Sequence, residues 1–127
     1  MTHKILVIED DVETLRFFGI LLRAAGFEVQ LASAPTEGLR LARLAPPSLV
    51  LLDIMMPDMD GWAVCEHLRQ IGQMPIIFVT ALKDAQNQTK GLVLAEDYIV
   101  KPFDPRELIQ RVRAQIGREV GSSPAAP

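Results

Sequence analysis

Residues 49–61 read LVLLDIMMPDMDG, and this stretch decides the fold. It opens with an unbroken apolar run from Leu49 that ends at Asp53. A short run of this kind is typical of a strand that helices cover on both faces of a parallel sheet. Turn-forming residues follow, and a helical pattern begins at Asp60. The stretch therefore predicts a strand, a loop and a helix, with an aspartate where the strand ends.

The same alternation of short β-rich runs and longer helical segments extends along the chain and predicts an α/β fold with one parallel sheet. The predicted strands are Lys4–Glu9, Glu28–Ala32, Leu49–Asp53, Ile76–Thr80 and Tyr98–Lys101. The predicted helices are Val12–Ala25, Thr36–Leu44, Asp60–Ile71, Asp84–Leu94 and a fifth that begins with Asp104 as its N-cap.

Length and composition bound the domain and its partners. The chain has 127 residues, 49% of them hydrophobic, which suffices for one compact core. We expect residues 1–119 to form the domain and residues 120–127 to form a flexible linker or tail. The 13 basic and 16 acidic residues give a net charge of −3, which argues against direct nucleic-acid binding. A single cysteine and the lack of an apolar run that could span a membrane predict a soluble, cytoplasmic protein.

Polar residues gather where the predicted strands end. In an open parallel sheet, ligands bind outside the carboxyl ends of the strands, at the point where the strand order reverses. If the order is 2-1-3-4-5, the acidic ends of strands one and three are neighbours, and the ends of strands four and five lie beyond Asp53. These strand-end residues are Glu9 and Asp10 for strand one, Asp53 for strand three, Thr80 for strand four and Lys101 for strand five.

Carboxylates gathered in one crevice repel each other and need a counter-ion. A set of oxygen ligands without histidine or cysteine favours Mg²⁺ or Mn²⁺ over zinc. Such a site can take a phosphoryl group, because a carboxylate such as Asp53 can serve as the nucleophile that forms an aspartyl phosphate. Lys101 would then hold one phosphoryl oxygen, and Thr80 could donate a hydrogen bond to another.

Four motifs in this order resemble the receiver domain of two-component response regulators over about residues 4–118. They are the acidic pair of ILVIEDD, the block LLDIMMPDMDG, the FVTA that contains Thr80 and the YIVKPF that contains Lys101. The resemblance implies a flavodoxin-like receiver fold: a doubly wound, five-stranded parallel sheet of order 2-1-3-4-5 with five helices. It also implies that a sensor histidine kinase or a histidine phosphotransfer protein phosphorylates Asp53.

The resemblance assigns further roles residue by residue. It implies that Glu9, Asp10, Asp53 and the backbone carbonyl of Met55 form the Mg²⁺ site, with Glu9 acting mainly through water. Thr80 and Tyr98 match the switch pair of the family, in which the hydroxyl moves toward the phosphoryl group and the aromatic ring turns inward. It also implies a cis peptide bond between Lys101 and Pro102.

One departure from the family pattern concerns the end of the fourth helix. Receivers usually have a glycine between helix four and strand five, whereas here Leu94 runs directly into Ala95. Because a glycine there closes the helix in a left-handed turn, helix four is expected to end early or to lie at a shifted angle. The change affects the helix 4–strand 5–helix 5 face, through which the family forms homodimers and partner contacts.

Some of these residues also have purely structural interpretations. Asp11 fits the N-cap of the first helix better than a metal ligand, and Asp60 fits a cap of the third helix. Tyr98 can be read as a half-buried strand aromatic. Trp62 is expected to pack near the mouth of the site, where it would serve as an optical probe.

Two other functions compete with the receiver hypothesis. A Mg²⁺-dependent phosphohydrolase would need a second carboxylate two residues after its nucleophile, where this chain has Met55, so we do not expect an enzyme. A flavin or nucleotide module would need a loop rich in backbone donors for phosphate, whereas this loop is acidic. Within the receiver hypothesis, Met55 and Leu82 offer no group that could orient a hydrolytic water, so a long-lived phosphoaspartate is expected.

Overall fold

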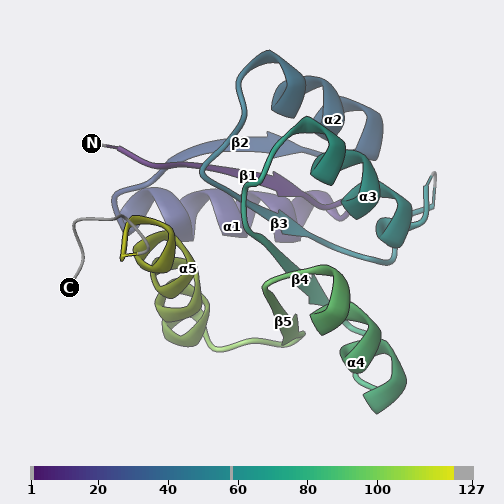
Figure 1. The fold of residues 1–127 in the computed structure, drawn as a ribbon. Helices are drawn as coiled ribbons and strands as arrows, with labels where there is room; N and C mark the ends of the chain where they lie inside the picture. The colour runs from purple at the N-terminus through teal and green to yellow at the C-terminus, as the bar shows by residue number, and fades with distance from the viewer. Residues whose placement is uncertain (1, 58, 122–127) are drawn as a thin grey trace.

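The computed structural model describes residues 2–57 and 59–121, the last four of them by their backbone only (Figure 1). Strands and helices alternate along the chain, as predicted. The strands are β1 Lys4–Ile8, β2 Glu28–Ala32, β3 Leu49–Leu52, β4 Ile76–Thr80 and β5 Asp97–Val100. The helices are α1 Val12–Ala24, α2 Pro35–Leu44, α3 Gly61–Ile71, α4 Ala85–Leu94 and α5 Pro105–Gly121.

The strands form one 5-stranded sheet in the order β2-β1-β3-β4-β5, and every neighbouring pair is parallel. This confirms the predicted order. The chain starts in the middle of the sheet, moves to one edge and then crosses β1 to build the other edge. The order reverses between β1 and β3, so the crevice where ligands bind in such sheets lies beside Asp53.

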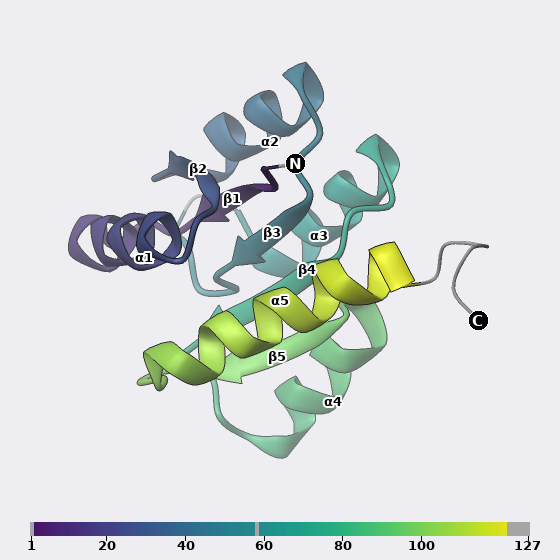
Figure 2. The same ribbon diagram turned by 90° about the vertical axis from the view of Figure 1, so that its left-hand side faces the viewer.

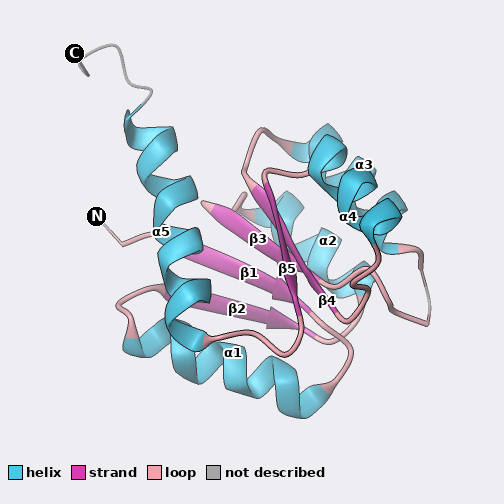
Figure 3. Ribbon diagram, turned by 90° about the horizontal axis from the view of Figure 1, so that it is seen from below, coloured by secondary structure: helices cyan, strands magenta, loops and turns pink. Residues whose placement is uncertain are grey.

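Two apolar layers pack against the two faces of the sheet. Figures 2 and 3 show α1 and α5 on one face and α2, α3 and α4 on the other. Alternate strand residues serve the two layers: Val50 and Leu52 face α2 and α3, whereas Leu49 and Leu51 face α1 and α5. The core strands are apolar on both sides for this reason, and only their ends carry polar side chains.

Several element boundaries differ from the prediction by one residue. β1 ends at Ile8 and β3 at Leu52, so Glu9 and Asp53 follow their strands and do not belong to them. β5 begins at Asp97, which pairs with Ile77, and it ends before Lys101. The side chains of Glu9, Asp53 and Lys101 turn toward the crevice, where Lys101 donates to both carboxylates.

Aspartates cap four of the helices and therefore lie just outside them. The carboxylates of Asp11, Asp60, Asp84 and Asp104 accept hydrogen bonds from backbone N–H groups in the first turns of α1, α3, α4 and α5, which confirms the predicted cap at Asp104. The interpretation of Asp11 and Asp60 as caps is confirmed, and the predicted helix starts at Asp60 and Asp84 were one residue early. α2 begins one residue earlier than predicted, because Pro35 is tolerated in a first turn.

The C-terminal helix extends past residue 119, where the sequence predicted that the domain would end. α5 continues to Gly121, and the rest of the predicted tail, residues 122–127, lies outside the described residues. Among the helices that the structure describes, none is both long and apolar enough to cross a bilayer.

Candidate functional site

Backbone hydrogen bonds continue beyond the strands and hold the strand ends together. The N–H of Asp53 donates to the carbonyl of Ile8 at 3.1 Å, which places the end of β3 beside the end of β1. On the other side, the N–H of Lys101 donates to the carbonyl of Thr80 at 2.8 Å. The polar residues predicted at separate strand ends therefore share one edge of the sheet.

Three carboxylates form a cluster at this edge. Carboxylate oxygens of Glu9, Asp10 and Asp53 all lie within 4.8 Å of one another. Glu9 is 2% exposed and Asp53 is 7% exposed, whereas Asp10 faces the solvent. Two carboxylates are therefore held in the crevice, and a third lies at its mouth, where an ion from solution can reach all of them.

Lys101 neutralises part of this negative charge. Its Nζ donates to Oδ2 of Asp53 at 3.0 Å and also to Oε1 of Glu9. Burial disfavours the charged ammonium, but its hydrogen bonds to Glu9 and Asp53 outweigh that effect and raise the pKa of Lys101. Lys101 is therefore a fixed cation in direct contact with the carboxylate of Asp53.

Glu9 has an unusual titration. Burial raises its pKa from 4.5 to about 7, and hydrogen bonds from Lys101 and from the N–H of Asp11 oppose that shift. The negative charge of Asp53 raises the pKa further. A bound cation would reverse this balance, because it favours the charged carboxylate.

The loop after β3 is fixed against Asp53 by a close approach of α3. The N–H of Met55 donates to Oδ1 of Asp53 at 3.0 Å, and the Met55 side chain is exposed. A Cβ on Gly61 would lie 2.4 Å from Cα of Ile54, so only glycine allows α3 to start this close to the loop. Both oxygens of Asp53 thus have a hydrogen-bond donor, one from the loop and one from Lys101.

The donor set fits a hard divalent cation. All three side chains of the cluster offer oxygen, and the set holds no histidine or cysteine. Three carboxylates are too few to complete an octahedral shell, which suits Mg²⁺ or Mn²⁺ because these ions keep waters and share phosphate oxygens. The chemistry of the cluster therefore agrees with the predicted Mg²⁺ site.

Thr80 and Tyr98 lie on neighbouring strands and meet the same loop. Thr80 is fully buried, and its Oγ1 accepts a long hydrogen bond of 3.4 Å from the N–H of Leu82. The Tyr98 hydroxyl donates to the carbonyl of Leu82 at 2.7 Å, and Tyr98 is 6% exposed. Tyr98 is therefore buried, not half-buried, and its ring points inward. Lys101 and Pro102 are joined by a cis peptide bond, as the resemblance implied.

The sequence did not predict that Gly91 makes room for the Tyr98 ring. A Cβ on Gly91 of α4 would lie 2.4 Å from Cδ2 of Tyr98, so the ring occupies the space that this glycine leaves open. The only signal in the sequence was a glycine inside a helical pattern, which often marks close packing.

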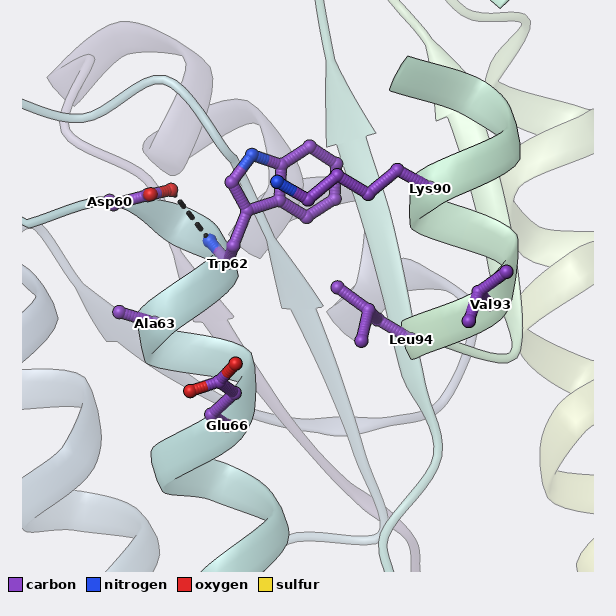
Figure 4. Close-up of a pocket in the computed structure, with 7 residues that line it drawn as sticks. All are labelled: Asp60, Trp62, Ala63, Glu66, Lys90, Val93 and Leu94. Atoms are coloured by element: carbon purple, nitrogen blue, oxygen red, sulfur yellow. Dashed lines mark hydrogen bonds between the residues drawn. The ribbon is translucent and has the colours of Figure 1, made fainter. Parts of the chain in front are cut away.

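Trp62 packs in a groove between α3 and α4, and its expected place near the mouth of the site stays a prediction. Its ring meets the edge of Phe78 at 5.2 Å between centroids, and Nζ of Lys90 lies 4.4 Å from the ring centre. Figure 4 shows the Lys90 side chain reaching across from α4 over the indole.

Comparisons with known proteins identify the family of this chain. The model of the response regulator receiver domain matches residues 5–113. The chain belongs to this family. Solved receiver domains share its fold: a CheY-like receiver domain protein from Methanospirillum hungatei has a TM-score of 0.91 at 29% identity and covers 97% of this chain and 100% of its own. The receiver domain of RstA from Klebsiella pneumoniae, solved in its BeF3-activated form, has a TM-score of 0.84 at 33% identity and covers 89% of this chain and 97% of its own.

Curated relatives of this receiver domain are longer proteins. A probable transcriptional regulator, ycf27, from Cyanophora paradoxa is 44% identical over 91% of this chain and 48% of its own length. The DNA-binding response regulator MtrA from Mycolicibacterium paratuberculosis is 42% identical over 93% of this chain and 53% of its own length. The chain thus spans about half the length of the curated relatives that it matches.

Proposed function

We propose that this receiver domain accepts a phosphoryl group on Asp53 from a phosphohistidine of a sensor histidine kinase or a histidine phosphotransfer protein. The observation that carries this proposal is the position of the Asp53 carboxylate. It lies in the crevice, 3.0 Å from Nζ of Lys101 and in one cluster with the carboxylates of Glu9 and Asp10.

In the transfer, a carboxylate oxygen of Asp53 attacks phosphorus as the phosphorus–nitrogen bond breaks. The bonding electron pair returns to the imidazole of the donor histidine, and the product is an aspartyl phosphate. Lys101 stays within reach of the phosphoryl oxygens and offsets their negative charge. The N–H of Met55 holds the second oxygen of Asp53 and orients the carboxylate.

Glu9, Asp10 and Asp53 are the side chains that would hold Mg²⁺, with Mn²⁺ as an alternative, and the Met55 carbonyl is the proposed backbone ligand. When bound, the ion neutralises the charge that accumulates when a phosphoryl group approaches three carboxylates. The protein contributes a preformed cluster that requires little rearrangement, because Glu9 and Asp53 are already buried side by side.

The proposed switch runs through Thr80 and Tyr98. Formation of the aspartyl phosphate would draw the Thr80 hydroxyl toward the new oxygens, and the hydrogen bond from the Leu82 N–H would be lost. The carbonyl of Leu82 accepts a hydrogen bond from the Tyr98 hydroxyl, so a movement of the loop that contains Leu82 would also change the position of the Tyr98 ring.

We propose a second copy of the chain as the partner of the α4–β5–α5 face. Leu92 is 54% exposed and Val93 is 79% exposed, which leaves apolar surface on α4. Arg111 of α5 forms ion pairs with Asp97 of β5 and with Glu107, and these charged groups could instead pair across a symmetric interface. Direct nucleic-acid contact and membrane attachment are not part of this proposal, and a cytoplasmic location remains a prediction from the sequence.

The phosphoaspartate is expected to persist for hours and not seconds. Met55 is exposed and Leu82 is partly buried near the site, and neither side chain can orient or deprotonate a water. For the same reason we propose a signalling domain and not a turnover enzyme. Substituting Met55→Glu should accelerate loss of the phosphoryl group at neutral pH, whereas rapid loss from the wild type would contradict this expectation.

The proposal is tested by titration with Mg²⁺ and then with beryllofluoride, a phosphoryl mimic, while Trp62 fluorescence is recorded. Wild type should respond to both additions. Asp53→Asn should lose the beryllofluoride response, and Asp104→Asn, which changes an exposed aspartate at the start of α5, should keep it. A wild-type chain without any beryllofluoride response would contradict the assignment.

A further inference from the structure

The C-terminal end of α4 lacks the usual means of closing a helix. The helix ends at Leu94 with no basic residue in its last turn, and Ala95 continues in extended backbone at φ −130° and ψ 167°. The N–H of Ala95 donates to the carbonyl of Gly91 at 2.8 Å. The carbonyls that follow Gly91 in the last turn have no partner within the helix, and no left-handed glycine supplies one.

Arg69 of α3 supplies a charged partner for the last of these carbonyls from outside the helix, and the thiol of Cys65 donates to the same carbonyl at 3.6 Å. Nη2 of Arg69 donates to the carbonyl of Leu94 at 3.1 Å, and its Nη1 donates to the carbonyl of Met74 at 2.7 Å. The same Nη2 lies 2.7 and 2.9 Å from the two carboxylate oxygens of Glu96. One guanidinium therefore joins α3, the segment before β4 and the segment between α4 and β5. It also places a positive charge at a helix C-terminus, where the helix dipole favours one.

Glu96 fastens this junction to the sheet. Its N–H donates to the carbonyl of Ile76 at 2.9 Å, and its Oε1 accepts from the N–H of Ile76 at 2.7 Å. Ile76 is the first residue of β4, so Arg69 and Glu96 meet at the N-terminal end of this strand, whereas Asp53 lies where the strands end. The C-terminal end of α4 is thus fixed to three elements far from the phosphorylation site.

The other end of α4 is connected to the site, and none of the residues in its N-terminal half is buried. Its N-cap, Asp84, follows the loop whose Leu82 contacts both Thr80 and Tyr98. Along the C-terminal half of α4, the residues Lys90, Val93 and Leu94 line a groove of about 580 Å³ toward α3, and Lys90 reaches across it to Trp62 (Figure 4). The one buried residue of α4, Gly91, also lies in this half, so the N-terminal half can move without displacing a buried residue of the helix.

We propose that Arg69 is a positioning residue that makes the C-terminal end of α4 the fixed end of the switch. A change at Thr80 then moves the N-terminal half of the helix, while Leu94 and the start of β5 stay in place. This inference rests on the proposed function, because it assigns a direction to the movement that phosphorylation of Asp53 would cause.

Amide hydrogen exchange in the presence and absence of Mg²⁺ and beryllofluoride tests the proposal on the whole chain. In wild type, beryllofluoride should alter exchange over residues 82–90 and leave Ala95 and Glu96 unchanged. In Arg69→Gln, these two amides should exchange at least about tenfold faster without ligand, because bonds to a charged donor are lost. In this variant, the beryllofluoride response should also extend to residues 91–96.

Three further variants separate positioning from a general loss of stability. Arg40→Gln is the matched control, since Arg40 also forms two hydrogen bonds with one glutamate but fixes no helix end. Arg69→Lys keeps the charge and should restore part of the protection. A glycine inserted between Leu94 and Ala95 should restore most of the protection in the Arg69→Gln background, because it allows the helix to close by itself.

The outcomes distinguish the two proposals. Exchange at Ala95 and Glu96 that is the same in Arg69→Gln as in Arg40→Gln would overturn the role of Arg69. A beryllofluoride response that spreads over all of α4 in wild type would also overturn it. A wild-type chain without any beryllofluoride response would instead contradict the proposed function, and the fixed-end role with it.

Discussion

Gly91→Ala should displace the Tyr98 ring from its inward position. The new Cβ would lie 2.4 Å from Cδ2 and 2.7 Å from Cε2 of Tyr98, and 3.3 Å from Cδ2 of Phe78. Phe78 is fully buried beneath the ring and cannot retreat, whereas Tyr98 lies at the edge of the core and can turn outward. The substitution therefore removes the hydrogen bond from the Tyr98 hydroxyl to Leu82.

The cost in stability can be worked from these contacts. Losing the hydrogen bond costs about 1 kcal/mol, and exposing part of the ring costs about 1–2 kcal/mol more. Alanine in place of glycine in a helix returns about 1 kcal/mol. The free energy of unfolding should therefore fall by about 1–2 kcal/mol. Gly117→Ala is the matched control on α5, where a Cβ meets nothing within 4 Å, and it should raise stability by about 1 kcal/mol.

Tyr98 is the only tyrosine of the chain, so its ionisation can be followed by phenolate absorbance. Burial, and then the charges of Asp84 and Asp53, raise the pKa of Tyr98 above its ordinary value of 10. Because burial favours the neutral phenol, turning the ring outward should lower the pKa toward 10 in Gly91→Ala and leave it unchanged in Gly117→Ala. An unchanged Tyr98 pKa in Gly91→Ala, accompanied by a loss of stability, would refute the reasoning, since α4 and not the ring would then have moved.

Other predictions concern the charged residues of the site and the glycine that fixes the loop after β3. Burial raises the pKa of Glu9 from 4.5 to about 7. Without metal, the stability that the protonated Glu9 contributes is therefore complete below a pH of about 4.5 and is lost as the pH rises through about 7. Urea unfolding across this range should show a smaller decline in Glu9→Gln than in wild type, and a decline of equal size would contradict the shift. Mg²⁺ should stabilise the wild type more at about pH 8 than at about pH 6, because the proton competes with the ion for Glu9. Lys101→Met should destabilise the metal-free protein by about 2 kcal/mol at neutral pH, because Glu9 and Asp53 lose their shared cation; added Mg²⁺ should recover part of that loss in thermal unfolding. Gly61→Ala should cost about 3 kcal/mol, because its Cβ meets the backbone of Ile54. Gly72→Ala, whose nearest neighbour is the flexible end of Met74 at 3.5 Å, should change the unfolding midpoint little.

The strand ends were predictable because their signals are local. Each apolar run identifies a strand, and the residue that ends the run lies at the crevice once the strands are parallel. The sequence alone therefore predicts that Glu9, Asp53 and Lys101 lie at one edge of the sheet. The predicted strands β1 and β3 were one residue too long at their C-terminal ends, because the sequence alone does not show where the backbone leaves the regular hydrogen-bond ladder.

The supports of the site were not predictable, because they depend on contacts between distant segments. Arg69 donates hydrogen bonds to the backbone carbonyls of Met74 and Leu94. Every residue has such a carbonyl, so the sequence does not indicate which of them an arginine will bind. The expectation that α4 would end early for lack of a closing glycine was wrong, because α4 ends at Leu94. The alternative, that α4 lies at a shifted angle, stays a prediction. The partner that compensates lies on another helix, and only the structure reveals it.

Phosphorylation of Asp53 tests the central claim most directly. The chain is incubated with a small acyl phosphate as phosphoryl donor and with Mg²⁺, and intact mass and peptide mapping are then measured. The account predicts one added phosphoryl group, located on Asp53, with none in Asp53→Asn and none when a chelator removes the ion. A phosphoryl group on another residue of the wild type, or none at all, would contradict it.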